Sequence, residues 1–297
     1  MLDLDLTRLP PRLHVGTSSF SWADWKGVFY PADAEPGEFL GHYAKVFRTV
    51  EIDATWHAMP SRRTVESWAR RVPEGFTFSL KVPKEITHDR YLEDCSTPWS
   101  QFLRALEPLG DKQGPLLFQF PYVAKKKDPE EYASGDDFRR RLAAFAGLLP
   151  AGGRYVVEVR NVTWYREPLL NLLRERGISL ALVSYYTMPP PQQLLRYGDP
   201  VTAPFSYLRF LGHHKQMDEL VQKARADRGK EHDWNEILVD RTNDMIQWAP
   251  VVMRLLGRQD DVFAYFNNHF AGFAPGSVDL FARVLDEYRR APERDTA

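Results

Sequence analysis

One stretch of the chain shows the repeating unit from which the fold is built. It consists of the strand-like run Thr49-Val50-Glu51-Ile52-Asp53-Ala54-Thr55, the segment Ser61–Val72 and a second strand-like run, Phe76–Val82. The outer two segments are short and alternate in polarity, which is typical of strands, whereas the middle segment has helical spacing. A strand, a helix and a strand in this order predict a parallel βαβ unit, because the helix returns the chain to the same edge of the sheet.

The same alternation extends along the whole chain. It predicts eight strands, at Leu13–Thr17, Thr49–Thr55, Phe76–Val82, Pro115–Phe120, Arg154–Arg160, Ile178–Ser184, Phe205–Phe210 and Asp261–Asn267. Eight units with helices between most of them are the number that closes a single (β/α)8 TIM barrel. The competing fold, a doubly wound open sheet, usually carries a glycine-rich phosphate turn after its first strand, and Gly16-Thr17-Ser18-Ser19 lacks the further glycines of that turn.

Two irregular connections interrupt the pattern. Met188-Pro189-Pro190-Pro191 follows the sixth strand, and three consecutive prolines do not fit inside a helix, so we expect a degenerate sixth crossover helix. A charged insertion, 213–233, follows the seventh strand and precedes a helix over Trp234–Leu256 that Pro250 should kink or interrupt. With no linker in the sequence, we expect one domain over residues 1–297, with a barrel core at about 12–290 and terminal extensions at 1–11 and 291–297.

The overall composition excludes several classes of protein. The chain has 43% hydrophobic and 27% charged residues, which rules out disordered, collagen-like and coiled-coil proteins. Its 39 basic and 40 acidic residues give a net charge of −1, so any attraction for nucleic acid has to be local, and no membrane partner is expected. A single cysteine, Cys95, and the absence of a secretory pattern in the first residues predict a cytoplasmic protein.

Polar residues stand at the end of each predicted strand, where barrel enzymes place their active sites. The alternation of side chains predicts that the following residues face the pore: Thr17, Glu51, Asp53, Thr55, Thr77, Ser79, Lys81, Gln119, Glu158, Arg160, Ser184, Tyr207, Arg209, Tyr265 and Asn267. Glu51 and Glu158 lie two residues deeper than the last polar position of their strands, and a buried carboxylate needs a partner. Two hypotheses stay open: a functional polar site, or a structural network in which three acids and three bases neutralise one another.

The chain also resembles a known family through motifs that recur in order. They are Val15–Trp22, Asp24–Pro31, Val50–Trp56, Phe78–Pro83, Ile86–His88, Gly114–Pro121, Val157–Arg160, Thr163–Trp164, Tyr207–Phe210 and Tyr265–Asn268. On these motifs it resembles the YecE-like family (domain of unknown function 72), which implies a TIM barrel but no established activity. Where the family pattern usually has two rim histidines, this chain has Asn161 and Leu211, and where it often has an aspartate after the sixth strand, this chain has Ser184-Tyr185. His57, His213 and His214 are candidates to replace the histidines in part, and a mechanism that depends on the usual ones is in question here.

The first functional hypothesis is an enzyme for a small substrate that carries phosphate or carboxylate. Lys81, Arg160 and Arg209 would hold the anion, and Glu51, Asp53 or Glu158 would transfer protons. Lys81 belongs to the same catalytic set, but not as a nucleophile, because nearby carboxylates should raise its pKa. The other predicted ligand-binding residues are Thr17, Ser18, Trp22, Trp25, Trp56, His88, Gln119, Trp164, Asn267 and Asn268. Loop packing is the alternative role for the tryptophans.

Two further hypotheses come from other classes of protein. One is nucleic-acid processing, by analogy of fold with barrel-type apurinic endonucleases and on the basic runs Arg62–Arg63, Lys125–Lys127 and Arg139–Arg141. The other is a binding protein that holds a ligand without turnover. The sequence shows no closely spaced metal-ligand motif and assigns neither a cofactor nor an oligomeric state.

Overall fold

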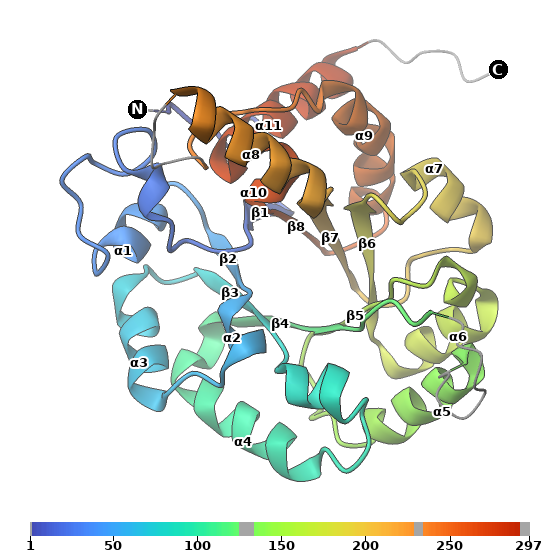
Figure 1. Cartoon of the computed structure of the whole chain (residues 1–297). Helices are drawn as coiled ribbons and strands as arrows, with labels where there is room; N and C mark the ends of the chain where they lie inside the picture. The colour runs from blue at the N-terminus through green and yellow to red at the C-terminus, as the bar shows by residue number, and fades with distance from the viewer. Residues whose placement is uncertain (1, 125–133, 229–233, 292–297) are drawn as a thin grey trace.

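Eight parallel strands, surrounded by helices, form the centre of the molecule (Figure 1). This architecture comes from a computed structural model that describes residues 2–124, 134–228 and 234–291. The strands are β1 (Leu13–Thr17), β2 (Thr49–Ile52), β3 (Thr77–Lys81), β4 (Gln113–Gln119), β5 (Tyr155–Glu158), β6 (Ser179–Tyr185), β7 (Phe205–Gly212) and β8 (Asp261–Phe266). They pair in the order β1-β8-β7-β6-β5-β4-β3-β2, which confirms the predicted single TIM barrel.

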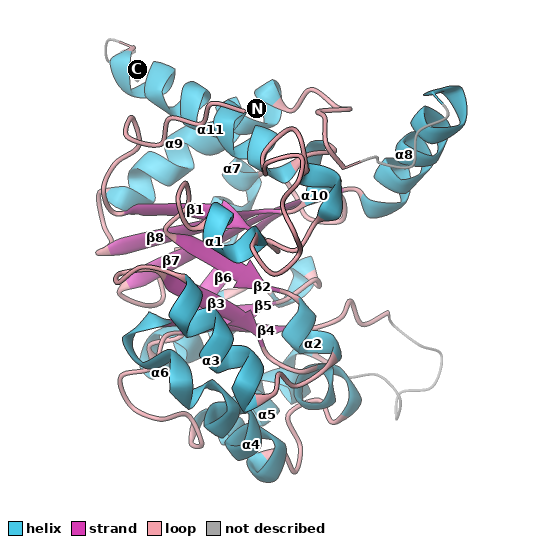
Figure 2. Ribbon diagram, turned by 90° about the vertical axis from the view of Figure 1, so that its left-hand side faces the viewer, coloured by secondary structure: helices cyan, strands magenta, loops and turns pink. Residues whose placement is uncertain are grey.

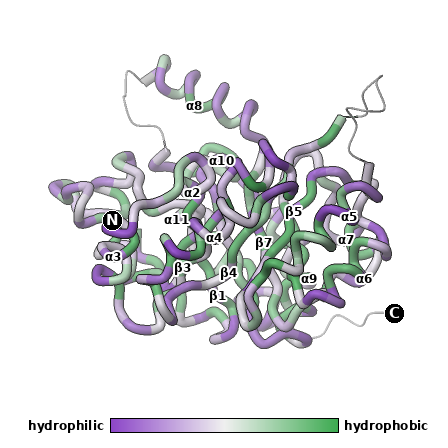
Figure 3. Tube along the Cα trace, turned by 90° about the horizontal axis from the view of Figure 1, so that it is seen from below, coloured by the Kyte–Doolittle hydropathy of each residue, from purple (hydrophilic) through white to green (hydrophobic). Residues whose placement is uncertain are grey.

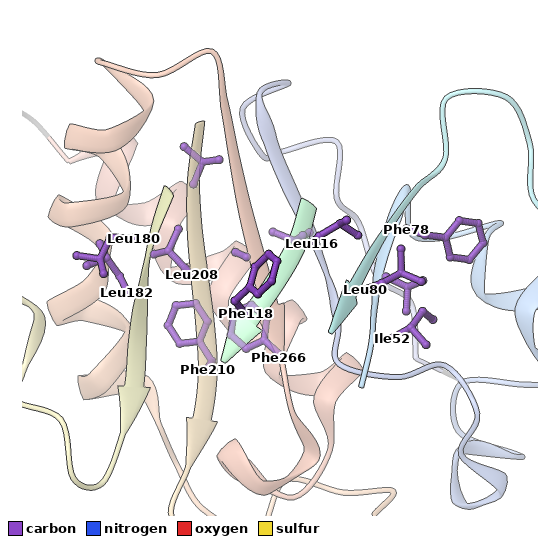
Figure 4. Close-up of a cluster of buried hydrophobic side chains, with 14 of the residues drawn as sticks. Ile52, Phe78, Leu80, Leu116, Phe118, Leu180, Leu182, Leu208, Phe210 and Phe266 are labelled. Carbon is purple, nitrogen blue, oxygen red and sulfur yellow. The ribbon is translucent and has the colours of Figure 1, made fainter. Parts of the chain in front are cut away.

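The helices mostly surround the strands (Figure 1). They are α1 (Phe39–Tyr43), α2 (Ala54–His57), α3 (Arg62–Arg71), α4 (Ser96–Leu106), α5 (Gly135–Ala146), α6 (Glu167–Arg176), α7 (Pro191–Leu194), α8 (His214–Arg228), α9 (Thr242–Leu256), α10 (Asn268–Ala271) and α11 (Ala274–Arg290). Figure 4 shows outward-facing strand residues of the core between the two layers, among them Leu80, Leu116, Phe118, Leu208 and Phe266. A second, smaller apolar cluster that includes Leu117, Val156 and Val183 fills the pore.

The irregular connections have the predicted character, with changed boundaries. The sixth crossover is a single helical turn, α7, which begins at Pro191, the first helical position, where proline is tolerated. Much of the charged insertion forms α8, which projects from the body of the molecule (Figure 2) and is largely hydrophilic (Figure 3). The predicted start of the next helix at Trp234 is wrong, because α9 begins at Thr242, and α9 continues through Pro250. Within the described ranges, no helix is long and apolar enough to cross a membrane.

Three predicted pore positions are wrong because strand length and register differ from the prediction. Thr17 is in register with Phe266, an outward-facing core residue, so it faces the helices, and Gly16 takes the pore position beside Tyr265. Ser184 follows Val183 of the pore cluster and therefore lies on the opposite face of β6. Strand β2 ends at Ile52, so Thr55 lies in α2, where its hydroxyl donates to the Ile52 and Lys81 carbonyls.

A tyrosine hydroxyl joins β1 and β2, the two ends of the strand order. The Oη of Tyr43 accepts a hydrogen bond from the Thr17 backbone N–H at 2.9 Å and donates one to the Thr49 carbonyl at 3.0 Å. The two backbones approach closely here, since a Cβ on Gly16 would lie 2.3 Å from the Thr49 oxygen. Tyr43 therefore provides a side-chain link between the strands at which the barrel closes.

Replacing Tyr43 with Phe is expected to destabilise the barrel. The variant removes the partner of a buried N–H and of a buried C=O, a loss on the order of 1–3 kcal/mol of unfolding free energy. Chemical denaturation of the wild type and Y43F measures it. Tyr288→Phe is the control, because Tyr288 is 45% exposed on α11. Equal unfolding free energies for Y43F and the wild type would show that the hydroxyl does not stabilise the contact between β1 and β2.

Candidate functional site

A cavity of about 340 Å³ opens at the carboxyl ends of the strands. We call it the rim pocket, and its lining residues are Asp53, Lys81, Gln119, Pro121, Tyr122, Arg160, Tyr185, Tyr186, Thr187, Arg209, Leu211, His214 and Asn267. Six of the predicted site residues are among them: Asp53, Lys81, Gln119, Arg160, Arg209 and Asn267. The structure thus brings together, around one cavity, residues from the ends of β2, β3, β4, β5, β7 and β8.

Arg209 forms the floor of this pocket and binds three carboxylates. Its Nη2 lies 2.7 Å from Glu51 Oε1 and 3.0 Å from Asp53 Oδ1, and its Nη1 lies 2.9 Å from Glu158 Oε2. Glu51 also accepts a hydrogen bond from the Tyr207 hydroxyl at 2.6 Å. Glu51 and Glu158 are completely buried and Arg209 is 2% exposed, so each of these three charges has a close partner away from water.

The two deep glutamates are separated from the pocket, because neither of them lines it. Burial alone would raise the pKa of Glu158, but the neighbouring guanidinium groups of Arg160 and Arg209 lower that pKa to about 2. Burial raises the pKa of Glu51, against the effect of Arg209. Placement therefore does not support direct proton transfer between a ligand and Glu51 or Glu158, and both residues have the geometry of a structural network.

Lys81 differs from the other buried charges because it has no direct partner. Across the described part of the chain, no hydrogen bond or ion pair reaches its Nζ, which lies 4.7 Å from the centre of the Trp56 ring. Burial lowers the pKa of Lys81, Asp53 opposes this and Arg209 adds to it. The neighbouring carboxylates raise this pKa, as predicted, but the loss of hydration outweighs their attraction, so the net shift is downward.

Arg160 is the second cation on the pocket wall. Its Nε donates to Glu158 Oε1 at 2.6 Å, and its guanidinium lies 4.0 Å from the centre of the Tyr185 ring. The ion pair and the ring fix the plane of the guanidinium. No hydrogen bond to a described residue uses its Nη1, so this nitrogen keeps its donors for a ligand.

Three aromatic residues of the pocket lining, Tyr185, Tyr186 and His214, are absent from the predicted site. The His214 ring lies 5.6 Å from the Tyr185 ring and 4.4 Å from the His269 ring, and Tyr186 lies 4.5 Å from Tyr185. Burial, with His269 and Arg160, lowers the pKa of His214 to about 4, so its ring is neutral at pH 7. The signal that could have found Tyr185 is its shared face with Val183, two residues earlier on β6.

Several predicted ligand-binding residues pack the loops around the pocket instead. Trp25 is fully buried against Phe29, and Trp164 stacks on Phe138 at 4.9 Å. Trp22 and Trp25, with Ser18 and Asn268, surround a separate cavity of only about 10 Å³. Asn268 accepts a hydrogen bond from the Ala274 backbone N–H at the start of α11. None of these residues lines the rim pocket.

Trp56 and His88 lie behind Lys81, outside the pocket lining. The Trp56 Nε1 donates to His88 Nδ1 at 3.3 Å, and burial with the nearby Lys81 charge lowers the pKa of His88 to about 4. A neutral imidazole and an indole ring thus lie beside Lys81, with the indole ring in contact with its amine. Trp56 contacts the Lys81 amine and His88 contacts Trp56, and neither residue lines the pocket.

The two positions where family histidines are replaced have different roles. Asn161 donates to the Val123 carbonyl and accepts from the Val123 N–H, both at 2.8 Å, and so ties the segment after β4 to the end of β5. Leu211 lines the rim pocket with an apolar side chain. A hydrogen-bonded asparagine and an apolar leucine therefore occupy the two positions of the family histidines.

The basic runs show no continuous free cationic surface in the described ranges. Arg139, Arg140 and Arg141 all form ion pairs with acidic residues, the last two of them with Asp137. Arg62 pairs with Glu66 and Glu107, and Lys125–Lys127 lie outside the described residues. In the same ranges, no three His, Cys, Asp or Glu side chains are grouped as ligands for a metal ion.

The fold is a TIM barrel, and its charged pocket lies at the carboxyl ends of the strands, the face at which barrel enzymes place their active sites. The family model "Protein of unknown function DUF72" matches residues 14–297, and the chain belongs to this family. The chain is 26% identical to the UPF0759 protein YunF of Bacillus subtilis over 284 residues, which cover 89% of this chain and 92% of YunF.

Other relatives agree with this assignment. The UPF0759 protein YecE of Escherichia coli is 29% identical over 149 residues, which cover 48% of this chain and about half (51%) of YecE. A solved DUF72 family protein from Thermotoga maritima is 27% identical, with a TM-score of 0.70 over 92% of this chain and 99% of that one. The predicted family and fold are thus confirmed, and the chemistry has to be argued from the pocket.

Proposed function

We propose that the rim pocket binds a small molecule carrying a phosphate or carboxylate group, and that the protein is an enzyme acting on it. The observation that carries this proposal is the unpaired ammonium group of Lys81, which shares the pocket wall with Arg160. A partly buried cation without an ion pair is costly, and an anionic ligand would supply that partner. At the pocket surface, Lys81, Arg160 and Arg209 face a single carboxylate, that of Asp53.

The three cations that line the pocket differ in how many carboxylates they bind. Because three carboxylates already bind Arg209, we assign the ligand anion to Lys81 and Arg160. A guanidinium group held flat by Glu158 and Tyr185 is suited to a phosphate or carboxylate oxygen, since its donors are fixed in direction. Specificity for an anion would then arise from the unused Nη1 of Arg160 and the Nζ of Lys81.

Asp53 is the group we propose for proton transfer. Of the four predicted catalytic residues, only Asp53 and Lys81 line the pocket. Asp53 is held by one oxygen, through the 3.0 Å contact of Oδ1 with Arg209, and no hydrogen bond to a described residue uses its Oδ2. The side chain of Asp53 is 31% exposed, so this second oxygen is accessible to a ligand or water.

The other hypotheses gain less from the structure. The paired arginines of the basic runs give nucleic-acid processing no specific support, and it stays a prediction. A binding protein without turnover would need the same two cations, but not the accessible oxygen of Asp53 beside them. The cytoplasmic location also stays a prediction.

Phosphate is expected to stabilise the folded protein against heat. A ligand that binds only the folded state, at about one hundred times its Kd, adds about 2.7 kcal/mol, which corresponds to a rise in Tm of several degrees. The measurement is a thermal melt in phosphate, sulfate or malonate against chloride at equal ionic strength. Arg160→Met is expected to lose most of the rise, because it removes one of the two cations.

Arg154→Met is the matched control for Arg160→Met. Arg154 directly precedes the start of β5, at the opposite end of that strand from Arg160, and it also pairs with a carboxylate, that of Asp261. Its variant should keep the full anion-dependent rise in Tm. The proposal fails if none of the three anions raises the wild-type Tm above its value in chloride.

A further inference from the structure

The surroundings of Lys81 suit an amine that reacts, and this inference rests on the proposed function. The carboxylates near it already have other partners: Glu51, Asp53 and Glu158 all bind Arg209, and Glu158 also binds Arg160. Lys81 is consequently not needed to hold any of them. Its Nζ meets the face of Trp56 on one side and belongs to the lining of the rim pocket.

The environment also favours the neutral form of the amine, the only form with a lone pair. Burial lowers the pKa of Lys81, Arg209 lowers it further, and the carboxylates of Asp53, Glu158 and Glu51 only partly compensate. The nearby cation Arg160 and the neutral His88 add no negative charge that would hold a proton on the nitrogen. A desolvated lysine beside another cation is a known arrangement for activating an amine as a nucleophile.

We propose that Lys81 is the nucleophile of the rim pocket and forms an imine with the carbonyl carbon of a small anionic aldehyde or ketone. In the reacting state Arg160 would hold the anionic group of this substrate, because Lys81, its partner in anion binding while protonated, has lost a proton to react, and Asp53 would carry protons between the lysine nitrogen and the carbonyl oxygen. All three side chains line the same 340 Å³ cavity. The substrate class is therefore a carbonyl compound that also carries a phosphate or carboxylate.

The step balances without an oxidant, a reductant or a metal ion. The nitrogen lone pair of Lys81 forms a bond to the carbonyl carbon, and the electron pair of the C=O π bond moves to the oxygen. The second oxygen of Asp53 accepts a proton from the nitrogen and returns it to that oxygen, which leaves as water when the C=N bond forms. Both protons of the amine end in the water molecule.

Reductive trapping tests this assignment directly. Wild-type protein is incubated with glyoxylate or pyridoxal 5′-phosphate and cyanoborohydride, and the labelled lysines are located by peptide mass spectrometry. Lys81 is expected to carry at least about tenfold more label than Lys84, because binding concentrates the aldehyde beside it. Inorganic phosphate should suppress this excess. Glycolaldehyde, which has no charge, should label Lys81 with a smaller excess than glyoxylate does, because the neutral amine favours the reaction but no anionic group holds this aldehyde in the pocket.

Two lysine variants separate the reactive role from a purely electrostatic one. Lys81→Arg keeps a cation but removes the amine, so the excess label should disappear and should not move to another residue. Lys84→Arg is the control, since Lys84 is exposed and lies 3.9 Å from Asp89, and it should leave the labelling of Lys81 unchanged.

The outcomes distinguish this inference from the function on which it rests. Uniform labelling of all lysines, with the phosphate-dependent rise in Tm intact, would overturn the nucleophile and leave the anion site standing. Excess label on Lys81 that phosphate does not suppress would overturn the anionic substrate class. Neither label nor stabilisation by any anion would overturn both proposals.

Discussion

Arg209→Met should lower the unfolding free energy by about 3–5 kcal/mol and the Tm on the order of 10 °C. The variant leaves the carboxylates of Glu51 and Glu158 completely buried without their shared cation. An isolated buried carboxylate has lost its hydration and, without Arg209, has no charge nearby that fully replaces it. Chemical and thermal denaturation of the purified variant measure the loss.

A triple variant keeps this prediction testable even if R209M does not fold. Glu51→Gln and Glu158→Gln, combined with Arg209→Met, leave no unpaired buried carboxylate, and we expect at least half of the lost stability to return. Arg62→Met is the control for the loss of an ion pair, because Arg62 is 60% exposed and its pairs with Glu66 and Glu107 contribute little. If the triple variant is less stable than R209M, the ion pairs of Arg209 with Glu51 and Glu158 do not account for the stability of the pore.

A second large effect concerns the acid stability of the barrel through Glu158. Arg160 and Arg209 outweigh burial and hold the folded-state pKa of Glu158 at about 2, below its ordinary value of 4.5. A depressed carboxyl pKa stabilises the folded state above pH 4.5, and this contribution is lost as the pH falls through 4.5 toward 2. Between pH 5 and pH 3 the wild type should lose about 2 kcal/mol through this residue alone.

Glu158→Gln isolates that contribution. The variant is less stable than the wild type at pH 5, and the difference between the two should shrink by about 2 kcal/mol at pH 3. Urea denaturation at both pH values gives the four free energies. Arg62→Met, measured in parallel, shows whether the loss of any ion pair has the same effect. A constant difference between wild type and E158Q at the two pH values would contradict the assignment.

The strand pattern was predictable because it depends on local alternation of side chains, whereas the exact pore faces were not. Strands β2 (Thr49–Ile52) and β3 (Thr77–Lys81) lie within the longer predicted runs Thr49–Thr55 and Phe76–Val82, because their apolar residues recur at the period of a strand. Thr17 was misplaced because the pairing of β1 with β8, far apart in the sequence, sets its orientation. Register between distant strands leaves no trace in a local pattern.

The candidate site was predictable in its location and partly in its charges. The depth of Glu51 and Glu158 in their strands indicated that they need partners, and Arg209 provides them. The behaviour of Lys81 was not predictable, because the sign of its pKa shift depends on how strongly burial acts relative to Asp53. Nor could local sequence distinguish Trp25 and Trp164, which pack the loops, from tryptophans that face a ligand.

The Tyr43 hydroxyl between β1 and β2 affects where the folded barrel opens locally. Where two strands share a backbone ladder, separation breaks several hydrogen bonds at once, but here a single side-chain rotation releases both the Thr17 N–H and the Thr49 carbonyl. The sub-global opening of lowest free energy should therefore begin between β1 and β2. Amide hydrogen exchange should be faster there than at the β7–β8 interface. Asp53, directly after β2, lies next to this opening, so ligand capture would rigidify the part of the fold that loosens first.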